Sequence, residues 1–291
     1  MVAVLLAKAG GPVEAITAVA QRYGEHIPAA NRPSWLTIGS LIFMTSFGTW
    51  GLPQMVQKFY SIKDTKMINR AAFITAVFAL VIGVSAYTTG ALGHVFFDTD
   101  TVPKLANGKV SYDLIVPTLL TAHLPEALLA VIMLLVLSAS MSTLSSLILV
   151  SSSAITIDLY KGYLHPEVNE KQSLIMIRVL SGIFIICSFA ISKMQVGFIV
   201  TLMSLSWGVL SGAFMAPYIL GIFWKRVTKA GAYAGLFSGG ATAIILFFVL
   251  GARQSPLASS IAMLVPFIIV PVVSLLTPKV DGKIISKAFE A

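Results

Sequence analysis

One long apolar segment carries the residues whose types and spacing could bind an ion. In Glu126–Ile157 the only charged residue is Glu126, and the middle of the segment is rich in serine and threonine. Ser142 and Thr143 follow Ala139 by three and four residues, which puts all three on one face of a helix. Two hydroxyls and the Ala139 carbonyl would be neutral ligands for a small hard cation. Neutral ligands suit a monovalent ion that must also leave.

The same hydroxyls have a second interpretation, which the sequence leaves open. Serine and threonine are small enough to let membrane helices pack closely, and each can donate its hydroxyl to the carbonyl four residues earlier. An ion site also needs several oxygen ligands, of which this helix supplies about three. We therefore expect a second element to complete any ion site that Ala139, Ser142 and Thr143 begin.

The composition indicates that these residues lie in a membrane. The chain has 291 residues, of which 57% are hydrophobic and 11% charged, whereas about 25% of the residues in a soluble domain are charged. This low charged fraction excludes a cytosolic enzyme. A nucleic-acid partner is also excluded, because the net charge of +8 comes from basic residues scattered between apolar runs. The single cysteine, Cys187, excludes a disulfide framework. The sequence predicts an integral membrane protein whose partner is the lipid bilayer.

Seven segments are long and apolar enough to cross a bilayer, which takes roughly 20 residues of helix. Between the second and third of them we expect a polar loop over Asp98–Asp113 and a short surface helix over Leu114–Pro125. The predicted spans are Pro33–Leu52, Arg70–Phe97, Glu126–Ile157, Gln172–Ser192, Gln195–Trp224, Ala230–Gly251 and Pro256–Leu276.

The distribution of lysine and arginine predicts the orientation of these spans. Most of the 20 Lys and Arg residues fall in connections on one side. By the positive-inside rule this side is cytoplasmic, so we expect the C-terminus in the cytoplasm and the segment before Trp35 outside. The basic residues concerned are Lys58, Lys63, Lys66, Arg70, Lys161, Lys171, Arg178, Lys225, Arg226, Lys229, Lys279, Lys283 and Lys287.

The first 33 residues contain no predicted span. Met1–Ala9 is apolar but too short to cross a bilayer, and it lacks the cleavage site of a signal peptide. We interpret it as the end of a truncated helix. Val13–Ile27 has the apolar spacing of a short amphipathic helix on the outer surface.

Several motifs occur in an order that resembles one family of membrane proteins. They are Trp50-Gly-Leu-Pro-Gln54, Tyr60-Ser-Ile-Lys-Asp64, Ala139-x-x-Ser142-Thr143, Ser152–Lys161, Gly221–Arg226 and Gly231–Gly235. Together they resemble the sodium/solute symporter family, which includes the bacterial sodium/proline and sodium/pantothenate carriers. Gly90–Gly93 and Asp113–Thr118 are most similar to the pantothenate branch.

The resemblance implies an all-α polytopic membrane protein of the LeuT type, which has two inverted five-helix repeats and a binding site near the middle of the bilayer. The chain would contain the second repeat, core helices 6–10, and lack the first. On this mapping, 1–33 is the end of the truncated helix and the outer surface helix. Residues 34–224 are core helices 6–10, and 225–291 are two accessory transmembrane helices and a cytoplasmic tail. The missing N-terminal repeat would belong to the same longer chain or to a second chain.

The resemblance also implies contacts to the transported solute. Ser46, Thr49 and Trp50 on core helix 6 would face the solute, as would Ser204 and Trp207 on core helix 10. Two alternatives remain for these residues. The tryptophan of helix 6 would also suit the membrane surface, where aromatic residues gather, and the small residues of helix 10 would also suit close helix packing.

The function implied is sodium-coupled symport of a small organic solute across the plasma membrane, with sodium bound by Ala139, Ser142 and Thr143. The solute would resemble pantothenate, proline or a short carboxylate. The alternatives are a non-transporting membrane fragment and, less favoured, a membrane-embedded enzyme. No charged residue lies at the centre of a predicted span to serve an enzyme, and His94 and Asp98 miss the spacing of membrane acyltransferases by one residue. Gly239-Gly240 suits a helix-packing notch better than a phosphate loop.

Overall fold

The computed structural model describes residues 1–26, 32–59, 64, 66–98, 100–105, 108, 110–194 and 198–289. Within these ranges the regular structure is helical, apart from an isolated antiparallel bridge between Lys104 and Val110. The chain divides by its contacts into two units, which are described separately. Unit 1 comprises Met1–Arg32 and Asp64–Val196, and unit 2 comprises Pro33–Lys63 and Gly197–Ala291.

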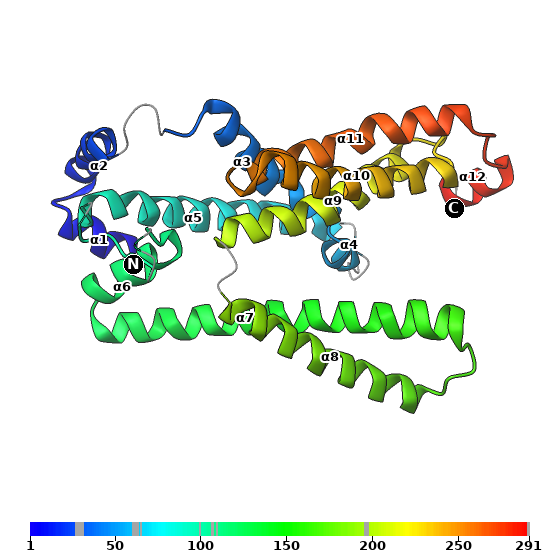
Figure 1. The fold of residues 1–291 in the computed structure, drawn as a ribbon, viewed down its shortest axis with the longest axis horizontal. Coiled ribbons are helices and arrows are strands. Elements are labelled where there is room, and N and C mark those ends of the chain that lie inside the picture. The colour runs from blue at the N-terminus through cyan, green and yellow to red at the C-terminus, as the bar shows by residue number, and fades with distance from the viewer. Residues whose placement is uncertain are drawn as a thin grey trace. The chain divides into compact units, whose positions relative to one another are not determined.

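Unit 1 contains three long apolar helices and several short ones (Figure 1). The sequence of elements is α1 (Val2–Lys8), α2 (Pro12–His26), α5 (Lys66–Phe96), α6 (Tyr112–His123), α7 (Glu126–Ser153), a π-helical segment (Ala154–Leu164) that continues α7, and α8 (Glu170–Lys193). The short helices predicted within Val13–Ile27 and Leu114–Pro125 are therefore confirmed as α2 and α6, although Ile27 lies outside the described residues. The helix α6 ends at His123, so the last two predicted residues, Leu124 and Pro125, lie beyond it.

The short helices of unit 1 pack around the C-terminal end of α5. A small apolar core joins them, made of Leu5, Ala15, Leu92, Leu119 and Leu124. Arg22 on α2 adds a polar tie: its Nη1 donates to the Val95 carbonyl at 2.8 Å and to the Asp98 carboxylate at 3.1 Å. The bend between α1 and α2 is 76°. The end of α5 is thus fixed by helices that are themselves too short to span a bilayer.

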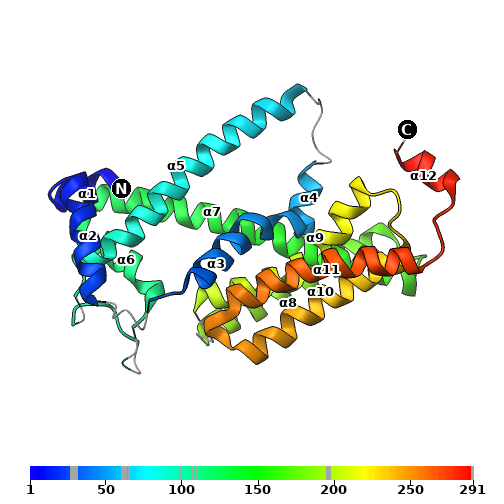
Figure 2. The same cartoon turned by 90° about the horizontal axis from the view of Figure 1, so that it is seen from above.

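Unit 2 contains a broken helix and a bundle of three long helices (Figure 2). Its elements are α3 (Trp35–Phe47), a 3₁₀ turn (Gly48–Gly51), α4 (Pro53–Phe59), α9 (Ile199–Phe223), α10 (Lys229–Leu250), a short 3₁₀ turn (Ala252–Gln254), α11 (Ser255–Leu276) and α12 (Gly282–Phe289). Residues 195–197, at the start of the predicted span Gln195–Trp224, lie outside the described residues. Residues 60–63 of the second sequence motif also lie outside them.

Small residues let the three long helices of unit 2 approach closely. Gly208 of α9 packs on Ser259 of α11, where an added Cβ would lie 2.7 Å from the Ser259 Oγ. Gly239 of α10 packs directly on the Gly212 backbone of α9. Gly231 of α10 packs on Ser274 of α11 in the same way. Backbone contact of this kind is how helices associate in lipid, where no hydrophobic effect drives them together.

Six helices are long and apolar enough to cross a membrane among the described residues, and they agree with six of the seven predicted spans. The predicted span Pro33–Leu52 is not one continuous helix, because it is interrupted at its glycines. The helix α3 ends at Phe47, a 3₁₀ turn follows, and α4 begins at Pro53. The physical reason is local: glycines at 48 and 51 weaken the helix, and proline cannot donate a helical hydrogen bond.

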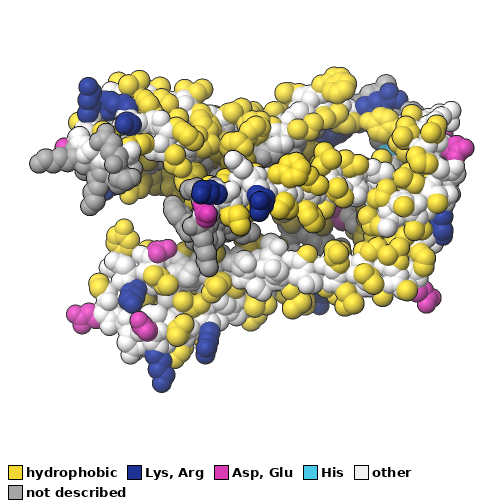
Figure 3. Space-filling view, turned by 180° about the vertical axis from the view of Figure 1, so that it is seen from behind, with side chains coloured by type: hydrophobic (Ala, Val, Ile, Leu, Met, Phe, Trp, Pro, Cys, Tyr) yellow, Lys and Arg dark blue, Asp and Glu magenta, His cyan; other side chains and the backbone are white. Residues whose placement is uncertain are grey.

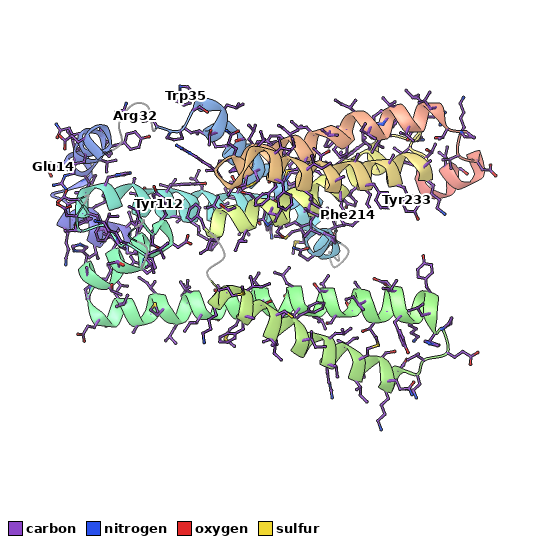
Figure 4. The ribbon with its side chains drawn as sticks, in the orientation of Figure 1. Glu14, Arg32, Trp35, Tyr112, Phe214 and Tyr233 are labelled. Atoms are coloured by element: carbon purple, nitrogen blue, oxygen red, sulfur yellow. The ribbon has the colours of Figure 1, made fainter. Side chains whose placement is uncertain are left out.

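The surfaces of the spanning helices are apolar, as the bilayer requires. The 18-residue apolar windows of α5, α7 and α8 have no buried residue. On the face drawn in Figure 3, hydrophobic side chains cover the middle of the helices, and charged side chains gather near helix ends. Trp35, at the start of α3, is 87% exposed (Figure 4). Exposed apolar surface of this extent is typical of lipid contact.

The contact units follow different boundaries from the predicted parts. Residues 34–224 contribute to both units, and the helices α10 and α11, predicted as accessory, pack against α9 as closely as against each other. The predicted parts assign residues to helices of the family, whereas the two units are defined by contacts within this chain. The predicted parts therefore stay a prediction.

Two adjacent glycines of α10 provide a matched test of this packing. We expect Gly239→Ala to lower the thermal unfolding midpoint, because its Cβ would overlap the Gly212 backbone, and overpacking costs about 1–3 kcal/mol. An added Cβ on Gly240 meets no described atom within 4 Å. Gly240→Ala should therefore leave the midpoint unchanged or raise it, since alanine favours helix by up to about 1 kcal/mol. Equal effects in detergent would contradict the packing described here.

Candidate functional site

Ala139, Ser142 and Thr143 all lie in the regular part of α7, and all three are exposed. At 1.5 Å per residue they are about 20–26 Å from the start of a continuous helix of 39 residues, and so lie near its middle. The Thr143 Oγ1 donates to the Ala139 carbonyl oxygen at 3.1 Å. Two oxygens this close can contact one ion at the roughly 2.3–2.6 Å typical of oxygen ligands around a hard cation.

The hydrogen bond from Thr143 leaves these oxygens able to accept an ion. Ser145 and Ser146 donate in the same way to the carbonyls of Met141 and Ser142, at 2.7 and 3.0 Å. The back-bonding expected for membrane hydroxyls is therefore present along this stretch of α7. A hydroxyl has one proton but two lone pairs, so a donated proton does not use the lone pairs that would face a cation.

A shallow, open hollow of about 600 Å³ runs along α7 at this level. Ala139 and Thr143 line it, together with Ser140 and four apolar residues, while Ser142 is on the helix beside it. The apolar lining residues are Leu137, Met141, Leu144 and Leu147. The described part of α7 thus offers two or three oxygens from one side only, which is fewer than a sodium-sized ion needs.

The break between α3 and α4 in unit 2 packs on one face of α9. We call this face, formed by Trp207, Ser211 and Met215, the seat. Ser211 donates its hydroxyl to the Gly48 carbonyl in a short, buried hydrogen bond. Trp207 lies against Gly48, where an added Cβ would be 2.8 Å from its ring. Gly51 is equally tight against Met215: a Cβ added to Gly51 would lie 2.9 Å from the Met215 Cβ. The three α9 residues are four positions apart, so a single helix face provides the whole seat.

The seat supplies what the broken helix lacks. A 3₁₀ turn interrupts the normal ladder of hydrogen bonds, and an unpaired carbonyl at membrane depth costs several kcal/mol. The Ser211 hydroxyl pairs with the carbonyl of Gly48, which is buried. Irregular backbone of this kind persists in membranes where it is packed in protein or lines a cavity.

A cavity of about 450 Å³ opens beside the turn. Thr49, Trp50 and Met55 form one wall, and the C-terminal part of α9 forms the other. The Trp50 side chain is 54% exposed, and its ring meets Phe47 edge-on at 5.1 Å between centroids. The α9 wall consists of Tyr218, Ile219, Ile222 and Phe223. The site is an apolar cavity with three aromatic residues and the hydroxyls of Thr49 and Tyr218.

The five predicted solute contacts are only partly together. Thr49 and Trp50 line the cavity, whereas Ser46 is exposed on α3 and is not among the lining residues. Trp207 packs on Gly48 one turn from the cavity. Ser204 is 0% exposed, donates to the Val200 carbonyl at 2.6 Å and offers its own carbonyl to the Ser259 hydroxyl of α11. In this structure Ser204 is a packing residue.

No Asp, Glu, His, Lys or Arg is among the described residues that line the hollow on α7 or the cavity beside the turn. Among the residues that the structure describes, no three His, Cys, Asp or Glu side chains come together. His94 stacks edge-on with Tyr23 at 5.5 Å between centroids, and Asp98 pairs with Arg22, so both serve the packing of α2 on α5. At the end of α6, burial lowers the pKa of His123, and the nearby Lys8 lowers it further.

Sequence reasoning missed the seat and the α9 wall of the cavity. Neither Ser211 nor Met215 was expected at the site, although their spacing from Trp207 by four and eight residues is a readable signal. Tyr218 and Phe223 carried no such signal, since an apolar helix offers many equivalent aromatic residues. Their position at the cavity depends on how the segment that leads into α4 packs against α9.

These features define a polytopic membrane protein with a broken helix beside a cavity and a charge-free helix that carries exposed oxygens. A model of the sodium:solute symporter family matches residues 14–239. The chain belongs to this family, which confirms the resemblance seen in the sequence.

Several curated relatives are proline transporters. The high-affinity proline transporter PutP of Bacillus subtilis is 30% identical over 212 residues, which cover 70% of this chain and 42% of the relative. The osmoregulated proline transporter OpuE of the same organism is 31% identical over 216 residues, 71% of this chain and 42% of the relative. The sodium/proline symporter of Escherichia coli is 26% identical over 247 residues, 83% of this chain and 48% of the relative. The chain spans less than half the length of these relatives, which are transporters and not enzymes.

The seat of the broken helix can be tested with two serines of the same helix. We expect Ser211→Ala to destabilise the protein by about 1 kcal/mol, because the buried Gly48 carbonyl would lose this hydrogen bond. Ser206 is exposed on α9, so Ser206→Ala should leave stability almost unchanged. Thermal unfolding of the purified variants in detergent measures both. A neutral Ser211→Ala would show that the turn does not depend on this hydrogen bond.

Proposed function

We propose that this chain forms part of a sodium-coupled symporter and that its solute is proline or a closely similar molecule. The observation that carries the proposal is the cluster of neutral oxygens at Ala139, Ser142 and Thr143, exposed at mid-depth on a helix without internal charge. Family membership supports sodium as the ion. Similarity to proline transporters favours proline over pantothenate and short carboxylates.

Sodium binds to this face of α7 and not to a cage of carboxylates. The Ala139 carbonyl and the hydroxyls of Ser142 and Thr143 provide about three of the ligands that the ion needs. The remaining ligands come from a second element that faces the hollow on α7. On the LeuT-type plan this element is the first core helix of the N-terminal repeat, supplied by the same longer chain or by a second chain.

The solute binds near the turn at Gly48–Gly51. Trp50 and Tyr218 offer ring faces to an apolar ring, and a tryptophan face also attracts a cationic ammonium group. The Thr49 hydroxyl can pair with a polar group of the solute. Ser46 and Trp207 flank this region, while Ser204 supports it through the contact of α9 with α11. A proline zwitterion combines the apolar ring and the charged amine that this cavity would recognise.

Coupling requires that sodium and solute prefer the same conformation, because equal affinity for two states shifts neither. Each sodium ion that enters contributes about 2.3 kcal/mol per 100 mV of membrane potential. A tenfold sodium gradient adds about 1.4 kcal/mol. Together these terms support roughly 500-fold accumulation of solute per ion. We further propose that the C-terminus lies in the cytoplasm, because most Lys and Arg residues fall on that side.

The assignment of the ion site predicts the effect of one substitution. In the complete carrier, Thr143→Ala should raise the sodium concentration for half-maximal proline uptake by roughly tenfold or more, because losing one contact to a charged group costs about 1.5 kcal/mol or more. Thr143→Ser keeps the oxygen and should stay close to wild type. Uptake of labelled proline at varied sodium concentration, with membrane abundance measured in parallel, gives the result.

A matched control lies one turn along the same helix. Ser146 is also exposed and donates to a carbonyl four residues earlier, as Thr143 does. Ser146→Ala should therefore leave the sodium dependence unchanged. If both alanine variants respond alike to sodium, Thr143 is not a ligand.

The choice of solute has its own test. We expect vesicles that contain the complete carrier to accumulate labelled proline when sodium is outside, and not when potassium replaces it. Labelled pantothenate and short carboxylates serve as competitors. Inhibition by pantothenate alone would reassign the solute, and failure to accumulate any of the three would favour the non-transporting fragment.

A further inference from the structure

One end of unit 2 concentrates positive charge where three spanning helices end. Lys225 and Arg226 follow α9, Lys229 begins α10, and Lys279 follows α11. Figure 3 shows Lys and Arg side chains gathered at this end of α11, next to α12. Within 221–289 the only acidic residue is Asp281. We call Lys225, Arg226, Lys229, Lys279 and the helix α12 the basic end.

The basic end is a built structure and not a set of loose side chains. Arg226 donates from Nη2 to the Thr277 carbonyl at 3.1 Å, which ties the α9–α10 connection to the end of α11. The hydroxyls of Thr228 and Thr277 are 2.7 Å apart, and the Thr228 backbone N–H donates to the Ser274 hydroxyl at 3.2 Å. These bonds hold the guanidinium of Arg226 in place, so its cost of ordering is already met before any ligand binds.

The second guanidinium nitrogen of Arg226 lacks an acceptor. Its Nη1 is buried and has no hydrogen-bond partner among the described residues. An arginine presents its donors as a planar fork that matches the oxygens of a phosphate or carboxylate. A buried, unpaired donor costs about 1–3 kcal/mol, more for a charged group. The position therefore favours an anionic acceptor from outside the chain.

Helix α12 has the pattern of a helix that lies in a membrane surface. It covers only Gly282–Phe289, too short to span a bilayer. Its sequence has apolar residues at 284, 285, 288 and 289 and lysines at 283 and 287, which is the spacing of an amphipathic helix. The Phe289 ring lies under the Lys225 ammonium, 5.4 Å from the ring centroid. Basic amphipathic helices of this kind bind anionic lipid surfaces.

We propose that the basic end binds the headgroups of anionic phospholipids in the membrane leaflet that it faces. The spanning helices end here, so these charges lie at headgroup level. Lys229 also lies 6.0 Å from the Tyr233 ring on α10, and an aromatic ring beside a lysine is typical of the membrane interface (Figure 4). Four to eight basic residues directly beyond a spanning helix are the sequence pattern of anionic-lipid recognition. The proposal rests on the membrane-spanning helices and not on transport.

The experiment compares lipids of different charge on the purified 291-residue chain. The chain is reconstituted in phosphatidylcholine nanodiscs with and without phosphatidylglycerol, and the lipids that stay bound after detergent extraction are quantified by mass spectrometry. We expect phosphatidylglycerol to be retained over phosphatidylcholine and to raise the thermal unfolding midpoint. Added salt should weaken the retention, because it screens charge.

Substitutions locate the effect. Lys229→Gln and Lys279→Gln change exposed side chains, and each should weaken phosphatidylglycerol retention about fivefold, since one basic residue near an anionic surface contributes about 1 kcal/mol. Arg226→Lys keeps the charge but loses the fork, so it should weaken retention as well. Arg253→Gln is the matched control, because Arg253 lies at the opposite end of α10 in the same unit.

Three results would overturn the proposal. The first is equal retention of the two lipids by the wild type, and the second is an Arg253→Gln effect as large as that of Lys229→Gln and Lys279→Gln. The third is stabilisation by inorganic phosphate in detergent to the same extent as by phosphatidylglycerol, which would identify a site for a free anion instead. Arg226→Lys also removes the hydrogen bond to the Thr277 carbonyl, and for this reason the two lysine variants carry the test.

Discussion

Hydrocarbon contains no water, so every backbone carbonyl at that depth must find a partner inside the protein. The break between α3 and α4 is possible because the Ser211 hydroxyl reaches the Gly48 carbonyl, and because Trp207 and Met215 close the space around the two glycines. The cavity beside Thr49 and Trp50 exists only because the helix stops there. A single side chain of α9 therefore supports the one irregular stretch of the spanning part of unit 2.

The same constraint shapes α7 without breaking it. Its hydroxyls donate to carbonyls one turn earlier, which satisfies their protons and keeps the helix regular. The lone pairs of those oxygens remain on the surface, and no formal charge accompanies them. This arrangement would hold a monovalent ion weakly enough for release, whereas carboxylates at the same depth would carry a large desolvation cost. Charge instead gathers at helix ends, where the headgroups are.

Much of the fold could be predicted from composition and the length of apolar runs. Six spans, the helices α2 and α6 and the family itself were all readable, because the bilayer imposes a minimum length on every crossing. The interruption within Pro33–Leu52 was readable in part, since Gly48, Gly51 and Pro53 weaken a helix but do not say where it stops. The α9 wall of the cavity, with Tyr218 and Phe223, depends on tertiary contact and had no periodic signal.

The sequence was a better guide to α7 than to α9. Ala139, Ser142 and Thr143 were identifiable because hydroxyls are conspicuous in a charge-free run. Ser204 has the same side chain as Ser211, yet Ser204 joins α9 to α11 while Ser211 supports the turn of the broken helix. Seven residues separate the two, which places them on nearly the same side of α9. Only the neighbours of each serine distinguish their roles.

The contact of Gly239 with Gly212 has a mechanical consequence. Where two backbones touch, side chains cannot bend to let one helix slide along the other, and α11 is locked to both by Ser259 and Ser274. The helices α9, α10 and α11 must therefore travel as one rigid block in any rearrangement of unit 2. Leu52 is the extended residue between the turn and α4, which makes it the natural pivot for that short helix.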